Sequence, residues 1–311
     1  MASITAPLNA PVVSDDRIDR LRRFNLVMGV LHLVSGGFML LVSNDFSLPV
    51  TSFATNGPPG TPLADGEMVE AFSYPLAVGT AGFLLLSAVA HLFVATLGFS
   101  FYASELRAGR NRIRWIEYAA SSTLMIVLIA SVVGIYDAGA LLAIAGANIA
   151  MILFGWLMET VNQPGRPVYW SPFWFGCIAG IAPWKAITAS VWISVAVADD
   201  GPPGFVYGIL VSIFLAFNCF ALNQWLQYRG KGRWADYAHG ETVYIWLSLI
   251  AKSLLAWQIW GNTLIEQSAA NGDDRAAVDH QSVLRITRTR GPVSRRRRRP
   301  LRARRRSPSP W

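Results

Sequence analysis

Six ionisable side chains lie within long apolar runs of the chain or close to their ends. They are His32, His91, Glu117, Glu159, Lys185 and Lys252. Charges in such runs are costly and usually serve a function. A lysine there has two sensible uses: it can form an ion pair with a carboxylate, or it can be the amine of a Schiff base, because burial frees the lone pair of its nitrogen.

Lys252 and Glu117 are the most natural pair among these groups. Lys252 lies half-way along the last apolar run, and Glu117 lies near the start of the third. A lysine on a helix points back toward the helix N-terminus, so Lys252 leans toward the level of Glu117. A protonated Schiff base needs such a carboxylate to stay charged in a low dielectric. A simple buried ion pair is the alternative, and position alone does not separate Lys252 from Lys185 in the fifth run.

Two histidines lie at matched depth on neighbouring runs. His32 is about eight residues into the first run, and His91 is about eight residues before the end of the second, or roughly 12 Å deep in each helix. A lone histidine is more often a structural hydrogen-bonding group. The matched pair favours a polar cavity that could hold water and accept or relay a proton.

The elements that carry these residues are seven predicted membrane-spanning helices. The chain has 311 residues, of which 53% are hydrophobic and 15% are charged. Its apolar runs are long enough to cross roughly 30 Å of hydrocarbon as helices. They lie at approximately 24–44, 73–99, 113–136, 140–160, 173–198, 204–226 and 241–263. We therefore predict an all-α seven-helix bundle over residues 24–266, with a long loop at 45–72, integral to the membrane of the cell.

The loop charges predict how the bundle is oriented. Arginine and lysine residues occur before the first run and after the second, fourth and sixth runs, whereas the other connections are acidic or neutral. The positive-inside rule then places the N-terminal segment 1–23 and these loops in the cytoplasm. Because the number of spans is odd, loop 45–72 and the C-terminus are expected outside.

The C-terminal segment 267–311 has a different composition from the rest of the chain. Residues 271–311 hold 13 of the 27 Lys and Arg residues and 3 of the 19 Asp and Glu residues. Such a segment cannot bury enough apolar surface to fold, so we predict a disordered basic tail. It could contact anionic lipid, and a nucleic-acid role is not expected.

Several stretches of the chain resemble one known family, the heliorhodopsins, over nearly all of residues 20–266. The stretches are Asn56-Gly57-Pro58-Pro59-Gly60, Arg114-Trp115-Ile116-Glu117-Tyr118, Met125 to Ala130, Ile152-Leu153-Phe154-Gly155-Trp156-Leu157, Pro172 to Gly180, Gly204-Phe205-Val206-Tyr207-Gly208 and Ala251 to Gln258. Several such stretches in the right order are specific, whereas one alone would not be. The family is known for an N-terminus in the cytoplasm, in agreement with the loop charges.

The resemblance implies a chromophore and the residues that bind it. It implies all-trans retinal on Lys252 as a protonated Schiff base, with Glu117 as counterion and Ser248 hydrogen-bonded near the nitrogen. His32 and His91 match the family's histidines in the cytoplasmic-side cavity. Further positions that match the surroundings of the chromophore are Tyr118, Ser121, Met125, Asn148, Phe217 and Asn218. A lysine at position 185 departs from the family, and the basic tail lies outside the resemblance. The family also suggests a homodimer.

The third run argues against proton pumping. Microbial proton pumps place a counterion, a threonine four positions later and an acidic proton donor eleven positions later on this helix. Here those positions are Glu117, Ser121 and Leu128, and leucine cannot return a proton. We therefore predict a slow, non-pumping photocycle for light signalling through a cytoplasmic partner. A light-driven transporter or light-gated channel, and a seven-helix protein without retinal, stay open as alternatives.

No enzymatic activity is expected from the sequence. It contains no metal-ligand cluster, no phosphate-binding glycine loop and no recognisable pattern of nucleophile and base.

Overall fold

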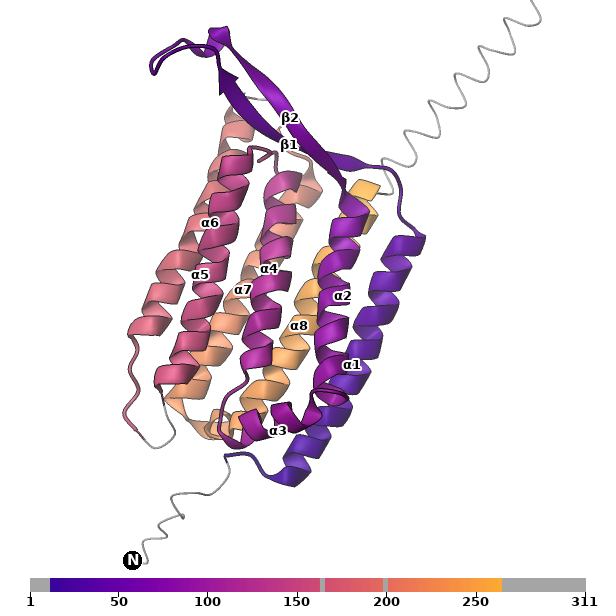
Figure 1. The fold of residues 1–311 in the computed structure, drawn as a ribbon, viewed down its shortest axis with the longest axis vertical. Coiled ribbons are helices and arrows are strands. Elements are labelled where there is room, and N and C mark those ends of the chain that lie inside the picture. The colour runs from indigo at the N-terminus through magenta and orange to yellow at the C-terminus, as the bar shows by residue number, and fades with distance from the viewer. Residues whose placement is uncertain (1–11, 163–165, 198–200, 265–311) are drawn as a thin grey trace, which may run out of the picture. The chain divides into compact units, whose positions relative to one another are not determined.

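The computed structural model describes residues 12–162, 166–197 and 201–264. Within these residues, seven helices are long and apolar enough to cross a membrane, which confirms the seven predicted spans. They are α1 (Asp15–Leu41), α2 (Leu76–Ala95), α4 (Arg112–Val132), α5 (Ala138–Val161), α6 (Ser171–Val197), α7 (Gly204–Arg229) and α8 (Tyr237–Ile259). The helices run alternately up and down in one bundle (Figure 1). Helix α8 continues into a π-helical turn at Trp260–Leu264.

The prediction of an all-α chain is wrong at residues 45–72. This segment forms an antiparallel hairpin of β1 (Ser47–Thr55) and β2 (Gly66–Pro75), with a short 3₁₀ turn at Leu63–Asp65 between them. The hairpin is attached to the bundle because Thr51 N–H donates to the Tyr136 carbonyl oxygen at 2.8 Å. The Asn56–Gly60 turn, with β-branched and aromatic residues on either side, carried the signal for two strands.

The second predicted run, 73–99, also differs from the structure. Helix α2 ends at Ala95, and a separate short helix α3 (Phe99–Arg107) follows it. The chain turns between them at Gly98, where a Cβ atom would lie 2.4 Å from the Phe93 ring. Helix α1 begins earlier than expected, at Asp15. The predicted disordered tail, 267–311, lies outside the described residues.

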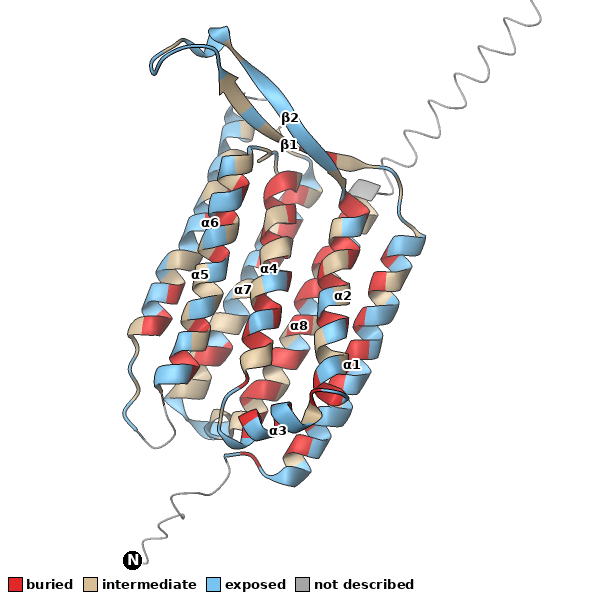
Figure 2. Cartoon of the chain, in the orientation of Figure 1, coloured by how far each residue is buried: buried red, intermediate tan, exposed pale blue. Residues whose placement is uncertain are grey.

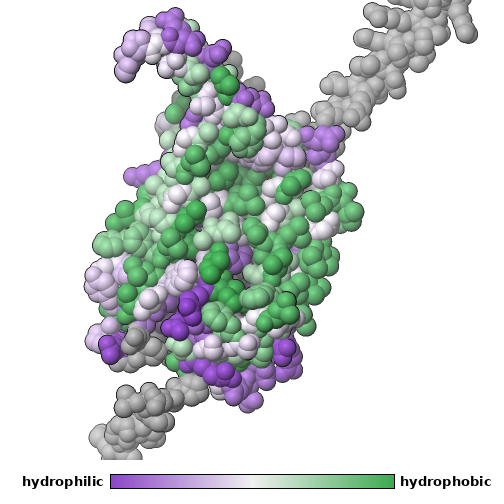
Figure 3. Space-filling view, in the orientation of Figure 1, coloured by the Kyte–Doolittle hydropathy of each residue, from purple (hydrophilic) through white to green (hydrophobic). Residues whose placement is uncertain are grey.

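The two ends of the bundle differ in charge. We call them the α3 end and the hairpin end, after the elements that lie there (Figure 1). Apart from Lys185 and Lys252, every described lysine and arginine lies at the α3 end, and the hairpin end carries Asp45, Glu67 and Glu70. In the face drawn in Figure 3, apolar side chains occupy the middle of the bundle and hydrophilic ones gather toward both ends. This arrangement fits a protein that spans a bilayer.

The core of the bundle is built mainly by α2, α4 and α8, whereas α6 and α7 turn more of their surface outward (Figure 2). Helix α1 packs closely on α2 because two glycines face it. Cβ atoms at Gly29 and Gly36 would lie 2.8 Å and 2.9 Å from the side chains of Leu92 and Leu85. Small residues of this kind let membrane helices approach each other.

A buried carboxylate connects α3 to the start of α4. The side chain of Glu105 accepts hydrogen bonds from Arg110 Nε at 3.0 Å and Arg112 Nε at 2.7 Å, and the residue is only 2% exposed. Burial acts to raise the pKa of this carboxyl, but the bonds from Arg112 and Arg110 outweigh it and lower the pKa below its usual value. Glu105 therefore stabilises the α3 end in its ionised form.

Replacing Glu105 with glutamine is expected to destabilise the protein by about 2 kcal/mol at neutral pH, because charge-assisted hydrogen bonds are lost. Since the folded-state pKa is depressed, this stabilisation is present above the unfolded value and is lost as the pH falls through the folded value. Thermal unfolding measured from neutral to acidic pH checks this. The wild-type and Glu105→Gln midpoints should converge in acid, and a constant difference would contradict the assignment.

Candidate functional site

Lys252 and Glu117 lie in direct contact inside the bundle. Lys252 Nζ donates to Glu117 Oε1 at 2.9 Å and to Ser248 Oγ, one helical turn earlier, also at 2.9 Å. Ser87 Oγ, from α2, donates to the same Glu117 oxygen at 2.6 Å. Lys252 is 3% exposed, so its ammonium charge is balanced almost entirely by this one carboxylate.

Two further side chains of α4 complete the surroundings of the lysine. The Tyr118 ring lies 5.2 Å from Lys252 Nζ, within range of a cation–π interaction, and its hydroxyl donates to the Tyr244 carbonyl oxygen at 3.1 Å. Ser121 is fully buried and lies one turn after Glu117. The sequence-predicted residues Lys252, Glu117, Ser248, Tyr118 and Ser121 are thus brought together at one place.

A largely apolar cavity extends from Lys252 between α4, α5, α6 and α7. Its lining includes the predicted residues Met125 and Phe217, together with Trp115, Phe173 and Cys177. The walls contain few polar groups, among them Ser121, Ser122 and Gln224. An apolar cavity lined by one amine suits an apolar ligand that carries one polar, reactive end.

Two glycines help to form the walls of this cavity. A Cβ atom at Gly155 would lie 2.5 Å from the Trp115 ring, and one at Gly176 would lie 3.2 Å from the Phe154 Cβ. Both glycines therefore let neighbouring helices and rings come close without a side chain between them. The cavity, its apolar lining and the single amine fit a retinal molecule bound to Lys252.

Of three further candidate residues, Asn148 lies beside the cavity, whereas Asn218 and Lys185 do not line it. The Asn148 amide is buried beside the cavity and donates to Ser122 Oγ at 2.8 Å and Thr123 Oγ1 at 2.9 Å. Asn218 is exposed on α7, and its amide donates to the Phe214 carbonyl oxygen; its predicted place near the chromophore is not what the structure shows. Lys185 is exposed near the middle of α6 and is not among the residues that line the cavity.

The two histidines lie against each other. The rings of His32 and His91 are stacked at a centroid distance of 5.5 Å and an angle of 7°, so the matched depth expected from the sequence is what the structure has. His91 Nδ1 is 2.7 Å from Asn25 Oδ1. A second, more polar cavity is lined by His91 and by Glu117. His32 lies behind His91 and is fully buried, with no hydrogen bond from its ring to any described residue.

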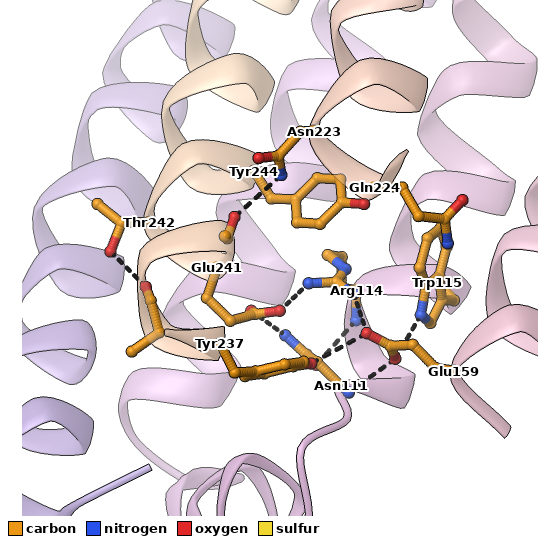
Figure 4. A network of polar contacts seen from close by, with 12 residues as sticks. Asn111, Arg114, Trp115, Glu159, Asn223, Gln224, Tyr237, Glu241, Thr242 and Tyr244 are labelled. Carbon is orange, nitrogen blue, oxygen red and sulfur yellow. Dashed lines mark hydrogen bonds and ion pairs between the residues drawn. The ribbon is translucent and has the colours of Figure 1, made fainter. Parts of the chain in front are cut away.

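Arg114 belongs to the group of arginines that follows the second predicted run and was counted with the loop charges, but it is a buried residue of the α3 end. It is 7% exposed and forms ion pairs with Glu159 of α5 and Glu241 of α8 (Figure 4). Glu241 was not foreseen from the sequence. Its position at the start of the last apolar run made it resemble a residue of a solvated helix end.

A family model settles the relationship of the chain to known proteins. The heliorhodopsin model matches residues 21–264. The chain belongs to the heliorhodopsin family. This confirms the resemblance in the sequence and makes the protein a light-responsive, retinal-binding protein of the membrane.

Solved structures of microbial rhodopsins share the fold of this heliorhodopsin. A light-driven proton pump from Leptosphaeria maculans aligns with a TM-score of 0.55 at 16% identity, covering 83% of this chain and 98% of that one. A cyanorhodopsin from the cyanobacterium Tolypothrix sp. NIES-4075 aligns with a TM-score of 0.53 at 13% identity, covering 81% and 96%. At such identities the likeness shows the fold alone. No curated protein matches the chain.

Some residues around the lysine of this heliorhodopsin were missed from the sequence. Ser87 stands alone in the run Leu84-Leu85-Leu86-Ser87-Ala88, and only the packing of α2 on α4 brings it to Glu117. Tyr244 and Gln224 line the apolar cavity from α8 and α7. Tyr244 lies eight residues before Lys252, a helical spacing that places both on one face, and this was the available signal.

Replacing Lys185 with leucine is expected to leave the visible absorption band unmoved and to raise the stability by about 2 kcal/mol, because a charge in mid-membrane is costly. The absorption spectrum and thermal unfolding of the retinal-bound protein in bilayers check both effects. Ile181→Leu, on the same exposed face, is the matched control. A shifted band in Lys185→Leu would show that this lysine acts on the chromophore after all.

Proposed function

We propose that the protein is a light sensor in which Lys252 binds all-trans retinal as a protonated Schiff base. Retinal supplies the absorption of visible light and the isomerisation that follows it. The observation that carries the proposal is Lys252, which lines a largely apolar cavity and whose Nζ lies 2.9 Å from Glu117 Oε1. That carboxylate serves as the counterion of the positive nitrogen.

The residues around the nitrogen each have a part in this proposal. Two serines bind the Lys252–Glu117 ion pair. The Ser248 hydroxyl accepts from the Lys252 nitrogen, and the Ser87 hydroxyl donates to Glu117. Tyr118 presents its ring face to the charge. Ser121 and Met125 of α4 and Phe217 of α7 line the cavity. His91, with His32 stacked on it, lies at the polar cavity beside Glu117 and would accept or relay a proton there.

The photocycle we propose moves no ion across the membrane. At the position where a pump would carry its proton donor, Leu128 is fully buried in the hydrophobic core with Met125, Ile126 and Ile129. Among the described residues, the ionisable groups that line the polar cavity beside Glu117 come from α3 and from the parts of α2, α4 and α8 nearest the α3 end. A proton that leaves the nitrogen would therefore return from the same side.

We further propose the orientation and the assembly. The concentration of lysine and arginine at the α3 end supports a cytoplasmic N-terminus and α3 end, with the hairpin and the C-terminus outside the cell. The signal would pass to a cytoplasmic partner at the α3 end. A homodimer, as the family suggests, stays a prediction that the molecular mass in detergent or nanodiscs can check.

Illumination of liposomes that contain the retinal-bound protein tests the proposed function. We expect transient absorption changes after a flash, with no sustained change of external pH and no sustained current. The Lys252→Ala variant, as control, should show none of these signals. A sustained light-dependent current that is absent from the control would instead establish the transporter or channel alternative.

A further inference from the structure

Arg114 stands between two buried carboxylates at the α3 end of the bundle (Figure 4). Glu159 comes from α5 and Glu241 from α8, and they are 6% and 1% exposed. Both form ion pairs with the one guanidinium. The two carboxylates differ in the number of donors that face them.

Every acceptor position of Glu159 is occupied. Its Oε2 accepts from the Asn111 backbone N–H at 3.0 Å and from Trp115 Nε1 at 2.7 Å. Its Oε1 accepts from the Tyr237 hydroxyl at 2.9 Å and from Arg114. A carboxylate offers about four lone-pair sites. Three of these four partners are N–H groups that can only donate, and only the Tyr237 hydroxyl could turn to accept a proton. Glu159 is therefore the better placed of the two acids to be the ionised partner of Arg114.

Glu241 has room for a proton. Its Oε2 accepts from Asn111 Nδ2 at 3.0 Å, and its Oε1 contacts Arg114. The Asn111 amide cannot turn around to change this, because its oxygen caps α4 by accepting from Arg114 N–H at 3.2 Å. About two of the four lone-pair sites of Glu241 are therefore left open.

The charge balance favours one proton in this cluster. Two carboxylates and one guanidinium leave a net charge of about −1 in a buried place, where an uncompensated charge is costly. Lys252 and Glu117 balance each other and cannot supply the missing positive charge. The other titratable groups that face the cluster are His91 from α2, Tyr102 from α3, Tyr118 from α4, Tyr228 from α7, and Tyr237 and Tyr244 from α8.

We propose that Glu241 is an exchangeable proton-binding site and is a neutral carboxylic acid in the dark. The polar cavity beside it is lined by Glu241, Arg114, Tyr118 and Glu117, so the bound proton lies next to a path toward the Lys252 pair. Proton binding at Glu241 is independent of retinal. Its use during a photocycle rests on the proposed function.

Infrared absorption of the full-length protein in the dark tests the proposal. We expect a carbonyl band of a neutral carboxylic acid that shifts in D₂O and is lost in Glu241→Gln. Glu105→Gln, which removes a buried carboxylate paired with two other arginines, should keep the band. If the band survives in Glu241→Gln, or if the wild type has none, Glu241 holds no proton and the proposal fails.

Thermal unfolding assigns the proton between the two acids. Glutamine has nearly the shape of a neutral glutamic acid, so Glu241→Gln should lower the unfolding midpoint only slightly. Glu159→Gln should lower it far more, because the new amide N–H group would face groups that also donate. The opposite order would place the proton on Glu159 and overturn the proposal. Neither measurement needs light or retinal. Both could therefore support a proton on Glu241 even if the proposed light-sensing function were wrong.

Discussion

The Lys252→Ala variant is expected to show no visible absorption band when all-trans retinal is added, whereas the wild type forms one. The reason is that Lys252 is the lysine that lines the apolar cavity. The second mid-membrane lysine, Lys185, is exposed on α6 and cannot replace it. Titration with retinal, followed by absorption spectroscopy, measures the effect.

The design must separate loss of the amine from loss of the fold. Removing Lys252 leaves Glu117 as an unpaired buried charge, which costs about 3–5 kcal/mol in comparable buried pairs. The double variant Lys252→Ala with Glu117→Gln removes that charge and should fold with a stability closer to the wild type. It too should form no band. A visible band in either folded variant would refute the assignment of Lys252.

The Glu117→Gln variant is expected to shift the visible band to the red at neutral pH. The carboxylate favours positive charge at the Lys252 nitrogen, and without it the charge spreads further along the chromophore. The contact of 2.9 Å between Nζ and Oε1 makes this the largest spectral change that we expect from any carboxylate of the chain. Absorption spectra of purified variants at matched pH measure the shift.

Ser87→Ala provides a graded comparison for the counterion. It removes one donor to Glu117 but keeps the carboxylate, so its band should move much less than that of Glu117→Gln. Glu105→Gln, at the α3 end, should leave the band in place. An unmoved band in Glu117→Gln would mean that another group serves as the counterion.

Much of the fold could be predicted from the sequence, because the bilayer imposes strong constraints on it. Apolar runs of about twenty residues must become helices in hydrocarbon, and all seven were found. The direction in which a helical lysine leans was sufficient to suggest Glu117 as the partner of Lys252, and the two side chains lie in contact. These inferences need only the geometry of a single helix and the direction of the membrane normal, along which all seven helices lie.

The features that were missed depend on packing between distant parts of the chain. Asn218 was assigned to the chromophore although it faces outward from α7, because sequence does not fix the rotation of a helix that is apolar on all sides. Arg114 resembled a loop cation, and only the approach of Glu159 and Glu241 permits its burial. The hairpin at Ser47–Pro75 is the exception, because its strands of 9 and 10 residues pair locally across the Asn56–Gly60 turn and that local signal was not used.

Reduction of the retinal-bound protein with borohydride tests the central claim most directly. Hydride addition turns the C=N bond between lysine and retinal into a stable secondary amine, so the modified lysine can be identified by mass spectrometry of peptides. We predict a retinyl group on Lys252 and none on Lys185. A retinyl group on Lys185, or unmodified Lys252 in a protein that has formed its visible band, would contradict the account.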